Sequence, residues 1–302
     1  MKRIGIIGIG EISKYYKMGF EKSQLLDLVA VCDIKKDPSS LNMYSKYRLY
    51  QDYLEMIDVE KLDYVLISTE SSKHYSIAKE CLEKGINVLI EPPCGLNINE
   101  VNELIDFAKS KALLFDVIMN AHLYDDIQYV HENHLRFGTL KEIHITCYEP
   151  ICNKTKLEDE RMLKSSGCYL ENAFDSFNIL NLFLPLKKVM LVDKKVKKDS
   201  KSKIDIRNNY ILYVDGVDVY IEYDWTQDSN FRNTKFVFEK NVVTVCHSNR
   251  LTTINLKEQI DYRNEEDSKQ KFYDNYLMNY DSKTNYDQIS LIHKLIFKMK
   301  NL

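Results

Sequence analysis

Three small residues near the amino terminus have the spacing of a dinucleotide-binding turn. Gly8, Gly10 and Ser13 follow an apolar run at residues 3–9 and precede a stretch with helical spacing at residues 12–22. In such a turn the first glycine permits the tight bend, the second lets a pyrophosphate approach the backbone, and the third small residue allows close packing. The N–H groups that open the helix favour phosphates. The predicted turn residues of the cofactor site are Gly8, Ile9, Gly10, Glu11 and Ile12.

An acidic residue follows at the distance expected for ribose binding. Asp33 lies about twenty residues after Ser13 and ends a second apolar run at residues 28–32. Its carboxylate can accept hydrogen bonds from ribose hydroxyls and would repel a 2′-phosphate. We therefore predict NAD as the cofactor and keep NADP as the second candidate, because Lys35 and Lys36 lie nearby.

Two further segments resemble motifs of a known enzyme family. Residues 67–74 end a third strand-like run and open a helix, and residues 85–93 run through a fourth and end in Glu91-Pro92-Pro93. With the first turn, they resemble the glucose-fructose oxidoreductase, inositol dehydrogenase and rhizopine-catabolism family. The pattern of that family is a strand, T-P-x-x-x-H, a helix, and G-x-H-V-x-x-E-K-P. The resemblance covers nearly the whole chain and implies an oxidoreductase that moves a hydride between a nicotinamide cofactor and a small substrate.

The resemblance also implies roles for single residues. A first group would lie along the cofactor, namely Ser68, Thr69, Glu70 and His74. Glu91 would face the nicotinamide ribose or the floor of the active site, and Asn120 would close the far side.

The sequence departs from the family at its catalytic residues. Pro92 stands where the family has the lysine of E-K-P. The second catalytic motif, G-G-G-x-L-x-D-x-G-x-H-x-x-D, aligns with residues 165–178, where Glu171, Asp175 and Asn178 replace the usual Asp, His and Asp. Their spacing at i, i+4 and i+7 puts them on one helical face. That face is either a polar wall of the active site or an ordinary solvated surface.

These substitutions change the expected chemistry. Oxidation of an alcohol needs a base, and histidine with a reference pKa near 6.5 is suited to it at neutral pH. A carboxylate such as Asp175 is a weak base unless burial or a neighbour such as Glu171 favours its protonated form. Reduction of an imine or a polarised double bond demands less, as in biliverdin-reductase-like members of the family. Tyr148, at the end of the first strand after residue 120, is a candidate proton donor. The predicted catalytic residues are therefore Asp175, Glu171 and Tyr148.

The elements that must position these residues fall into two predicted domains. Up to residue 120, short apolar runs alternate with amphipathic stretches, which is typical of βαβ units around a parallel sheet. From residue 121 a helix and a strand are followed by another helix and by several strand-like runs at residues 188–255. Asp215-Gly216 joins two of these runs as a hairpin turn. We predict an α/β fold, with an N-terminal Rossmann domain (1–120) and a C-terminal α+β substrate and oligomerisation domain with a largely antiparallel sheet (121–302).

Composition excludes several other classes of protein. The net charge of −3 argues against a protein that mainly binds nucleic acid. No apolar run is long enough for a membrane span, and the start of the chain is unlike a signal peptide, so we expect a cytoplasmic protein. The seven cysteines are scattered without a C-x-x-C pair, and we expect no metal site. Glycine is scarce at nine residues, so each glycine is expected to meet a demand of the backbone.

The sequence thus predicts an NAD(P)-dependent oxidoreductase that lacks the usual lysine and histidine of its family. Sugars, cyclitols and nucleotide sugars are the substrates that the resemblance implies, and a C=N or C=C reduction stays open. A homodimer or higher homo-oligomer is the expected assembly. The alternative is a sensor or regulatory protein that has kept the NAD(P) site and lost turnover.

Overall fold

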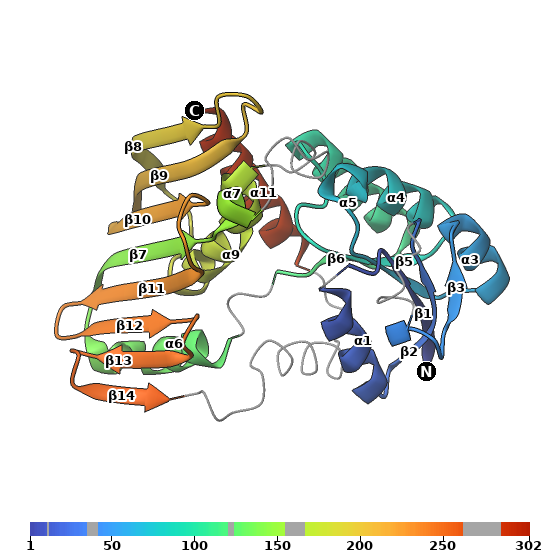
Figure 1. The fold of residues 1–302 in the computed structure, drawn as a ribbon, viewed down its shortest axis with the longest axis horizontal. Helices are drawn as coiled ribbons and strands as arrows, with labels where there is room; N and C mark the ends of the chain where they lie inside the picture. The colour runs from blue at the N-terminus through green and yellow to red at the C-terminus, as the bar shows by residue number, and fades with distance from the viewer. Residues whose placement is uncertain (11, 35–41, 120–123, 155–166, 262–284) are drawn as a thin grey trace. The chain divides into compact units, whose positions relative to one another are not determined.

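The computed structural model describes residues 1–302 apart from 11, 35–41, 120–123, 155–166 and 262–284. The described residues form two compact units (Figure 1). The first contains those within Met1–Ile118 and Glu266–Lys294, and the second those within Met119–Glu265 and Leu295–Leu302. The last helix, α11 (Tyr286–Asn301), therefore contributes residues 286–294 to the first unit and the rest to the second.

The first unit is built on a parallel sheet. Its six strands lie in the order β3-β2-β1-β4-β5-β6. They are β1 (Lys2–Ile7), β2 (Leu26–Cys32), β3 (Arg48–Tyr50), β4 (Tyr64–Ile67), β5 (Asn87–Ile90) and β6 (Phe115–Val117). The order runs outward from β1 in one direction and from β4 in the other. In such a doubly wound sheet ligands bind beyond the carboxyl ends of the strands, where the order reverses.

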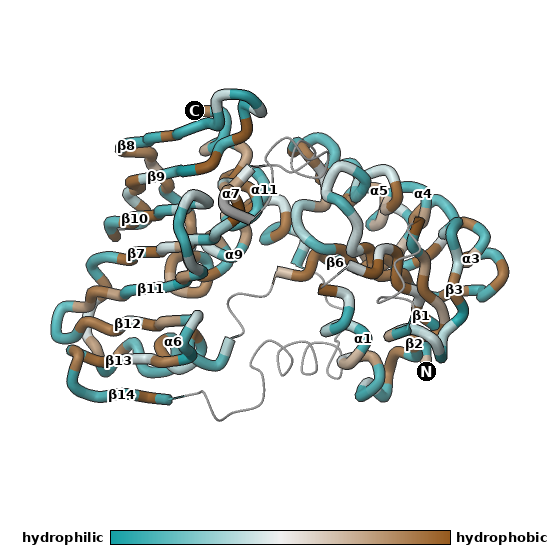
Figure 2. Tube along the Cα trace, in the orientation of Figure 1, coloured by the Kyte–Doolittle hydropathy of each residue, from teal (hydrophilic) through white to brown (hydrophobic). Residues whose placement is uncertain are grey.

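Helices cover both faces of this sheet. They are α1 (Ser13–Lys22), α3 (Tyr53–Glu60), α4 (Ser71–Glu83) and α5 (Ile98–Lys111). Ile4 and Ile6 of β1 are fully buried in a core with Tyr16 of α1, whereas a Cβ on Gly5 would lie 2.9 Å from the Cε atom of Met56 of α3. Because both faces are covered, the strands are nearly continuous apolar runs, seen in Figure 2 as brown segments in the N-terminal sheet.

Two elements of the first unit were not predicted from the sequence. Strand β3 has three residues at the edge of the sheet, too few for a clear alternation. Helix α3 begins after Asp52, whose carboxylate accepts a hydrogen bond from the backbone N–H of Leu54 at 2.8 Å. An aspartate before an apolar stretch is a helix N-cap signal, so the sequence did contain the sign of this helix.

The second unit contains a mostly antiparallel sheet of eight strands in the order β14-β13-β12-β11-β7-β10-β9-β8. The strands are β7 (Leu140–Tyr148), β8 (Val189–Lys198), β9 (Asp205–Val214), β10 (Val217–Asp224), β11 (Phe231–Phe238), β12 (Val242–Cys246), β13 (Leu251–Ile254) and β14 (Glu258–Asp261). Only the β7–β10 pair among them is parallel. The hairpin at Asp215-Gly216 is confirmed, since it joins the antiparallel strands β9 and β10.

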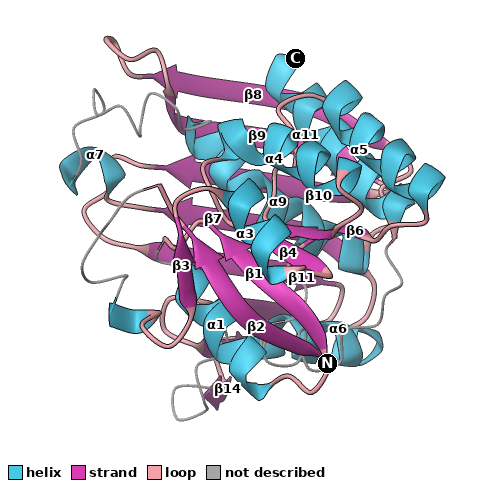
Figure 3. Ribbon diagram, turned by 90° about the vertical axis from the view of Figure 1, so that its right-hand side faces the viewer, coloured by secondary structure: helices cyan, strands magenta, loops and turns pink. Residues whose placement is uncertain are grey.

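The second unit also contains helices, drawn in cyan in the second view of the molecule (Figure 3). They are α6 (Asp125–Phe137), the short α7 (Ile151–Lys154) and α9 (Gly167–Phe183). Helix α9 contacts β9 and β10. The predicted α/β fold class, a parallel Rossmann sheet followed by a largely antiparallel one, is confirmed.

No helix in the described part of the chain is long and apolar enough to cross a membrane. The helix expected at residues 269–278 lies outside the described residues.

Candidate functional site

The turn after β1 has the backbone that the sequence predicts. Gly8 has a φ of +94°, and a Cβ there would lie 2.7 Å from the backbone carbon of Ser68, so a side chain is excluded. At Gly10 the opposite holds, because a Cβ would meet nothing within 4 Å. The turn is therefore closed on the side of β4 and open beside Gly10, where a pyrophosphate could approach the backbone.

Asp33 lies directly against this turn. Its Oδ2 atom accepts a hydrogen bond from the backbone N–H of Ile9 at 2.9 Å, and the N–H of Gly8 donates to the carbonyl of Cys32 at 2.8 Å. These two bonds join the end of β2 to the end of β1. A carboxylate held at this place suits the ribose hydroxyls of a dinucleotide.

The other predicted cofactor residues follow the next two strands. The backbone N–H of Ser68, after β4, donates to Ile7, and that of Glu91, after β5, donates to Ile67. Thr69 and Glu70 come next, and Glu70 is the N-cap of α4. Because the carboxyl ends of parallel strands lie along one edge, these residues share an edge with the glycine turn. Glu11 and Asn120 lie outside the described residues.

His74 connects two of these loops instead of pointing to solvent. The residue is 1% exposed. Its Nδ1 atom lies 2.8 Å from the carbonyl oxygen of Pro93 and its Nε2 atom 2.9 Å from that of Thr69. Burial lowers the pKa of His74, although the carbonyl oxygens oppose that shift. His74 therefore joins the loops after β4 and β5, and its ring does not face solvent.

A dinucleotide fits the residues around the turn. The open space beside Gly10, the exclusion of a side chain at Gly8 and the carboxylate of Asp33 are the three features that such a ligand needs. Ile12 precedes α1, whose first N–H groups face the same turn.

In the second unit, α9 carries two of the predicted catalytic residues, Glu171 and Asp175, and starts at a long-range cap. The Oδ2 atom of Asp205, from β9, accepts hydrogen bonds from the backbone N–H of Tyr169 at 2.9 Å and from the side chain of Asn208 at 2.6 Å. Gly167 has a φ of +81°, and a Cβ there would lie 2.6 Å from the Cγ atom of Asp205. The glycine retained in the predicted catalytic motif thus makes room for the cap of α9.

The three residues that were predicted to share one helical face differ in exposure. Glu171 is exposed, the side chain of Asp175 is 43% exposed, and Asn178 is 1% exposed. Of these three residues, only Glu171 and Asp175 are accessible to a ligand.

Arg232 is a prominent residue of this region that the sequence reasoning missed. Its Nη2 atom lies 2.8 Å from Oε1 of Glu149, and its Nη1 atom lies 3.5 Å from Oδ2 of Asp175. Glu149 is held further by the Trp225 indole N–H at 2.9 Å and by the side-chain amide of Asn172 at 3.3 Å. We call Arg232, Glu149, Asp175, Asn172 and Trp225 the Arg232 cluster.

The register of the sheet explains why Arg232 reaches α9. Arg232 of β11 pairs with Cys147 of β7, and the Cys147 thiol donates to the Asn172 side chain of α9 at 2.9 Å. Paired residues share a face, so Arg232 points to the side covered by α9. The later residues on this face of β11, such as Phe236, are buried. The sign of this role in the sequence was an arginine at the start of a strand whose later residues on the same face are buried.

The charges of this cluster favour the ionised form of Glu149. Burial tends to raise the pKa of Glu149, but Arg232 and the hydrogen bonds from Trp225 and Asn172 hold it below its usual range. The same guanidinium also pairs with the side chain of Asp175, so that Arg232 links the two carboxylates.

Tyr148 lies apart from Asp175 and Glu171. Side chains alternate along β7, so Tyr148 points to the face opposite Cys147, where it contacts Phe231. Its hydroxyl donates to Glu222 at 2.9 Å. Burial and this carboxylate raise the pKa of Tyr148 to about 12. The structure thus brings Asp175 and Glu171 together on α9 and does not bring Tyr148 to them.

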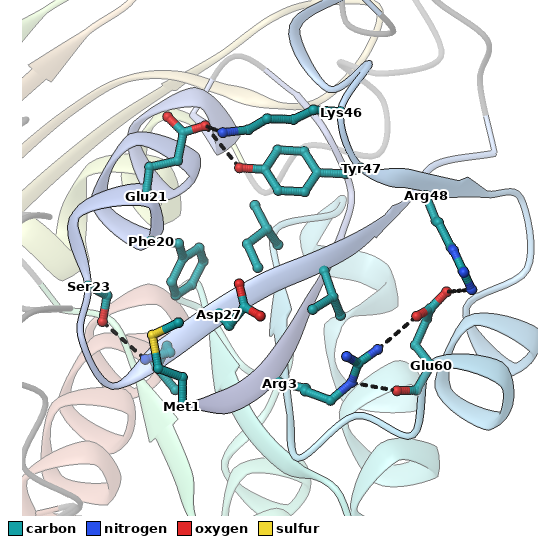
Figure 4. Close-up of a pocket in the computed structure, with 13 residues that line it drawn as sticks. Met1, Arg3, Phe20, Glu21, Ser23, Asp27, Lys46, Tyr47, Arg48 and Glu60 are labelled. Carbon is teal, nitrogen blue, oxygen red and sulfur yellow. Dashed lines mark hydrogen bonds and ion pairs between the residues drawn. The ribbon is translucent and has the colours of Figure 1, made fainter.

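A cavity of about 590 Å³ lies in the first unit (Figure 4). Its lining includes the amino-terminal end of β1, residues 26–29 of β2 and the carboxyl end of α1, whereas the glycine turn follows the carboxyl end of β1. Lys46 pairs with Glu21, and both Arg3 and Arg48 pair with Glu60, at 2.9 and 3.1 Å. Because these cations are already paired, we assign no phosphate-binding role to the cavity. Among the described residues no group of three His, Cys, Asp or Glu could hold a metal ion.

Comparisons with known proteins agree with this geometry. Residues 2–119 match a family described as an oxidoreductase family with an NAD-binding Rossmann fold. The chain is 24% identical over 149 residues to the rhizopine catabolism protein MocA of Rhizobium meliloti. The matched region covers 49% of this chain and 46% of that protein. It therefore spans less than half the length of this curated relative.

Solved structures match over nearly the full length. The MviM dehydrogenase of Clostridium difficile has a TM-score of 0.79 at 15% identity, with 99% of each chain covered. Biliverdin reductase of Synechocystis, solved with biliverdin and NADP+, has a TM-score of 0.77 at 16% identity, with 98% and 97% covered. The resemblance inferred from the motifs is thus confirmed over residues 2–119, and the solved structures share the fold of the chain.

Proposed function

Because residues 2–119 match an oxidoreductase family with an NAD-binding Rossmann fold, we propose that this protein is an NAD(P)-dependent oxidoreductase that acts on a small molecule. The observation that carries the proposal is the turn after β1, closed at Gly8, open at Gly10 and bordered by Asp33. We further propose that residues 1–120 bind the cofactor and that residues 121–302 bind the substrate and mediate oligomerisation.

NAD is the cofactor that this turn favours. Gly8, Ile9, Gly10 and the start of α1 would hold the pyrophosphate, and Asp33 the adenosine ribose. A carboxylate at this place repels the 2′-phosphate of NADP. The bound nicotinamide would supply or accept the hydride. The loops after β4 and β5, with Ser68, Thr69, Glu70 and Glu91, would complete the site, and His74 would keep two of them in place.

Asp175 and Glu171 of α9 are the proposed polar residues toward the substrate, with Arg232 as a third. The guanidinium of Arg232 is 44% exposed and has N–H groups beyond those directed at Glu149 and Asp175. It can therefore donate to a substrate oxygen while it orients the two carboxylates. Tyr148 is left out of this group, because it lies on the opposite face of β7.

Of the two directions of reaction, Asp175, Glu171 and Arg232 support reduction of the substrate better. Alcohol oxidation needs a base that takes up a proton, and this region offers carboxylates, which as a class are weaker bases than histidine. Reduction of a carbonyl or an imine can use a proton from solvent. The ion pair equally favours the second candidate, a sensor that binds NAD(H) without turnover, since Asp175 is engaged within the protein.

The test of cofactor binding compares the wild-type chain with Gly10→Ala. We expect NADH to raise the melting temperature of the wild type more than NADPH does, and neither to stabilise Gly10→Ala. A methyl group at Gly10 would meet no protein atom but would occupy the space left for the pyrophosphate. Unchanged stability of unliganded Gly10→Ala is the control. A wild type that neither nucleotide stabilises would refute the proposal.

Turnover decides between the enzyme and the sensor. We expect NADH oxidation with at least one substrate from a panel of keto sugars, imines and conjugated enones, and loss of that rate in Asp175→Ala. Binding of NADH without turnover over the whole panel would favour the sensor.

A further inference from the structure

A chain of two hydrogen bonds leads from the core of the first unit to the glycine turn. The hydroxyl of Tyr44 donates to Oγ of Ser13 at 2.7 Å, and the hydroxyl of Ser13 donates to the carbonyl oxygen of Gly10 at 2.6 Å. Ser13 is 1% and Tyr44 2% exposed. Both hydroxyls are thus buried and hydrogen-bonded to each other. The two hydrogen bonds end on Gly10, which borders the open space.

The ring of Tyr44 is fixed by its surroundings. It belongs to the apolar core that also contains Tyr16 and Phe20 of α1 and Leu28 of β2. Burial raises the pKa of Tyr44 to about 12, although the bond to Ser13 opposes the shift. The hydroxyl therefore remains a protonated donor at neutral pH, and its position is set by packing.

The Gly10 carbonyl receives two hydrogen bonds from Ser13. The backbone N–H of Ser13 donates to it at 3.1 Å in addition to the hydroxyl. Together they direct this carbonyl toward the first residue of α1. A glycine or alanine, the usual residue at this third position of the motif, could not make the second bond.

We propose that Tyr44 is a positioning residue for the cofactor, which acts through Ser13 to hold the Gly10 carbonyl and so keeps the turn ready for the pyrophosphate of NAD(H). The inference rests on the proposed function, since it concerns the same turn. A turn already held in its binding conformation loses less freedom when the ligand binds, which strengthens binding. Tyr44 is 31 residues away from Ser13 in the sequence, so no local motif would reveal this role.

The test measures NADH binding to the full chain by nucleotide fluorescence in four variants: Tyr44→Phe, Ser13→Ala, the double variant, and Tyr47→Phe. Tyr44→Phe keeps the packed ring and removes only the donor. We expect the Kd for NADH to rise about fivefold to tenfold in the first three variants, as the loss of one net hydrogen bond implies. If Tyr44 acts through Ser13, the double variant binds no more weakly than either single one.

Tyr47→Phe is the matched control. The Tyr47 hydroxyl donates to Glu21 at 2.9 Å, near the carboxyl end of α1 (Figure 4). The glycine turn precedes the other end of that helix. The same chemical change three residues along the chain should leave the Kd for NADH unchanged.

Thermal stability separates positioning from a purely structural role. Ser13→Ala leaves the Tyr44 hydroxyl buried without its acceptor, so its melting temperature should fall. Removing both hydroxyls leaves no unpaired group, so the double variant should regain most of the lost stability. We expect its NADH affinity to stay low, because the Gly10 carbonyl still lacks the second bond.

Two results would overturn the inference. One is a Kd in Tyr44→Phe equal to that of the wild type, and the other is an affinity in the double variant that recovers together with its stability. Failure of the proposed function looks different, because then the wild type itself would not bind NADH.

Discussion

The cap of α9 predicts an unequal cost for the same substitution at two glycines of the second unit. Gly167 and Gly216 both have positive φ, at +81° and +96°. A Cβ at Gly216 would meet nothing within 4 Å, whereas at Gly167 it would lie 2.6 Å from Cγ of Asp205. Gly216→Ala therefore measures backbone strain alone, and Gly167→Ala measures strain together with displacement of the cap.

The structure gives the size of each effect. An alanine in the left-handed region costs about 1–2 kcal/mol. At Gly167 the Asp205 carboxylate must also move from the N–H of Tyr169 and the amide of Asn208. Hydrogen bonds to a charged group contribute about 1.5–3 kcal/mol. We expect a loss of about 2.5–5 kcal/mol in the free energy of unfolding for Gly167→Ala, against about 1–2 kcal/mol for Gly216→Ala.

The chain supplies its own reporter for this measurement. Trp225 is its one tryptophan and is 3% exposed within the second unit. Urea unfolding followed by tryptophan fluorescence therefore reports on the unit that contains both glycines. Asp205→Ala, alone and combined with Gly167→Ala, completes a double-mutant cycle, in which we expect the second substitution to add little. Equal losses for the two glycine variants, within about 0.5 kcal/mol, would refute the reasoning.

Three further predictions follow from the Arg232 cluster and from Gly8. Arg232→Leu leaves Glu149 partly buried without its cation and should lower the free energy of unfolding by about 1–3 kcal/mol in the same fluorescence assay. Arg136→Leu, which breaks an exposed 3.8 Å pair with Glu258, should lower it by under about 1 kcal/mol. Equal losses for the two variants would contradict the role of the cluster. Because the pKa of Glu149 is lower in the folded than in the unfolded state, ionised Glu149 stabilises the fold. This contribution to stability is fully present above the unfolded pKa of about 4.3 and is lost as the pH falls through the lower folded pKa. Glu149→Gln should therefore flatten the decline in stability below about pH 4.3 in acid titrations of Trp225 fluorescence, and an unaltered acid limb would contradict this assignment. Gly8→Ala should lose both stability and NADH affinity, unlike Gly10→Ala, because its Cβ would collide with the backbone of Ser68. Calorimetry of both variants with and without NADH measures this difference. A Gly8→Ala variant as stable as the wild type would contradict the prediction.

The sequence by itself determined most strands of the first unit and its glycine turn, though not the contribution of α11 to that unit. Buried parallel strands are continuous apolar runs, and a dinucleotide turn needs small residues at fixed local spacing, so both are visible along the chain. Gly8, Gly10 and Asp33 lie where the motif places them. The elements that escaped prediction, β3 and α3, are a three-residue edge strand and a short helix. Their local signals are weak because few residues carry them.

Only the tertiary structure decided which distant residues meet. Arg232 reaches Asp175 because the pairing of β11 with β7 puts it under α9, and sheet register is not encoded in local spacing. Tyr148 points away from Asp175 because of the alternation of β7. Tyr44 reaches Ser13 through packing in the core. Motifs thus fixed the cofactor turn, whereas long-range pairing determined the charged neighbours of Asp175 and the support behind that turn.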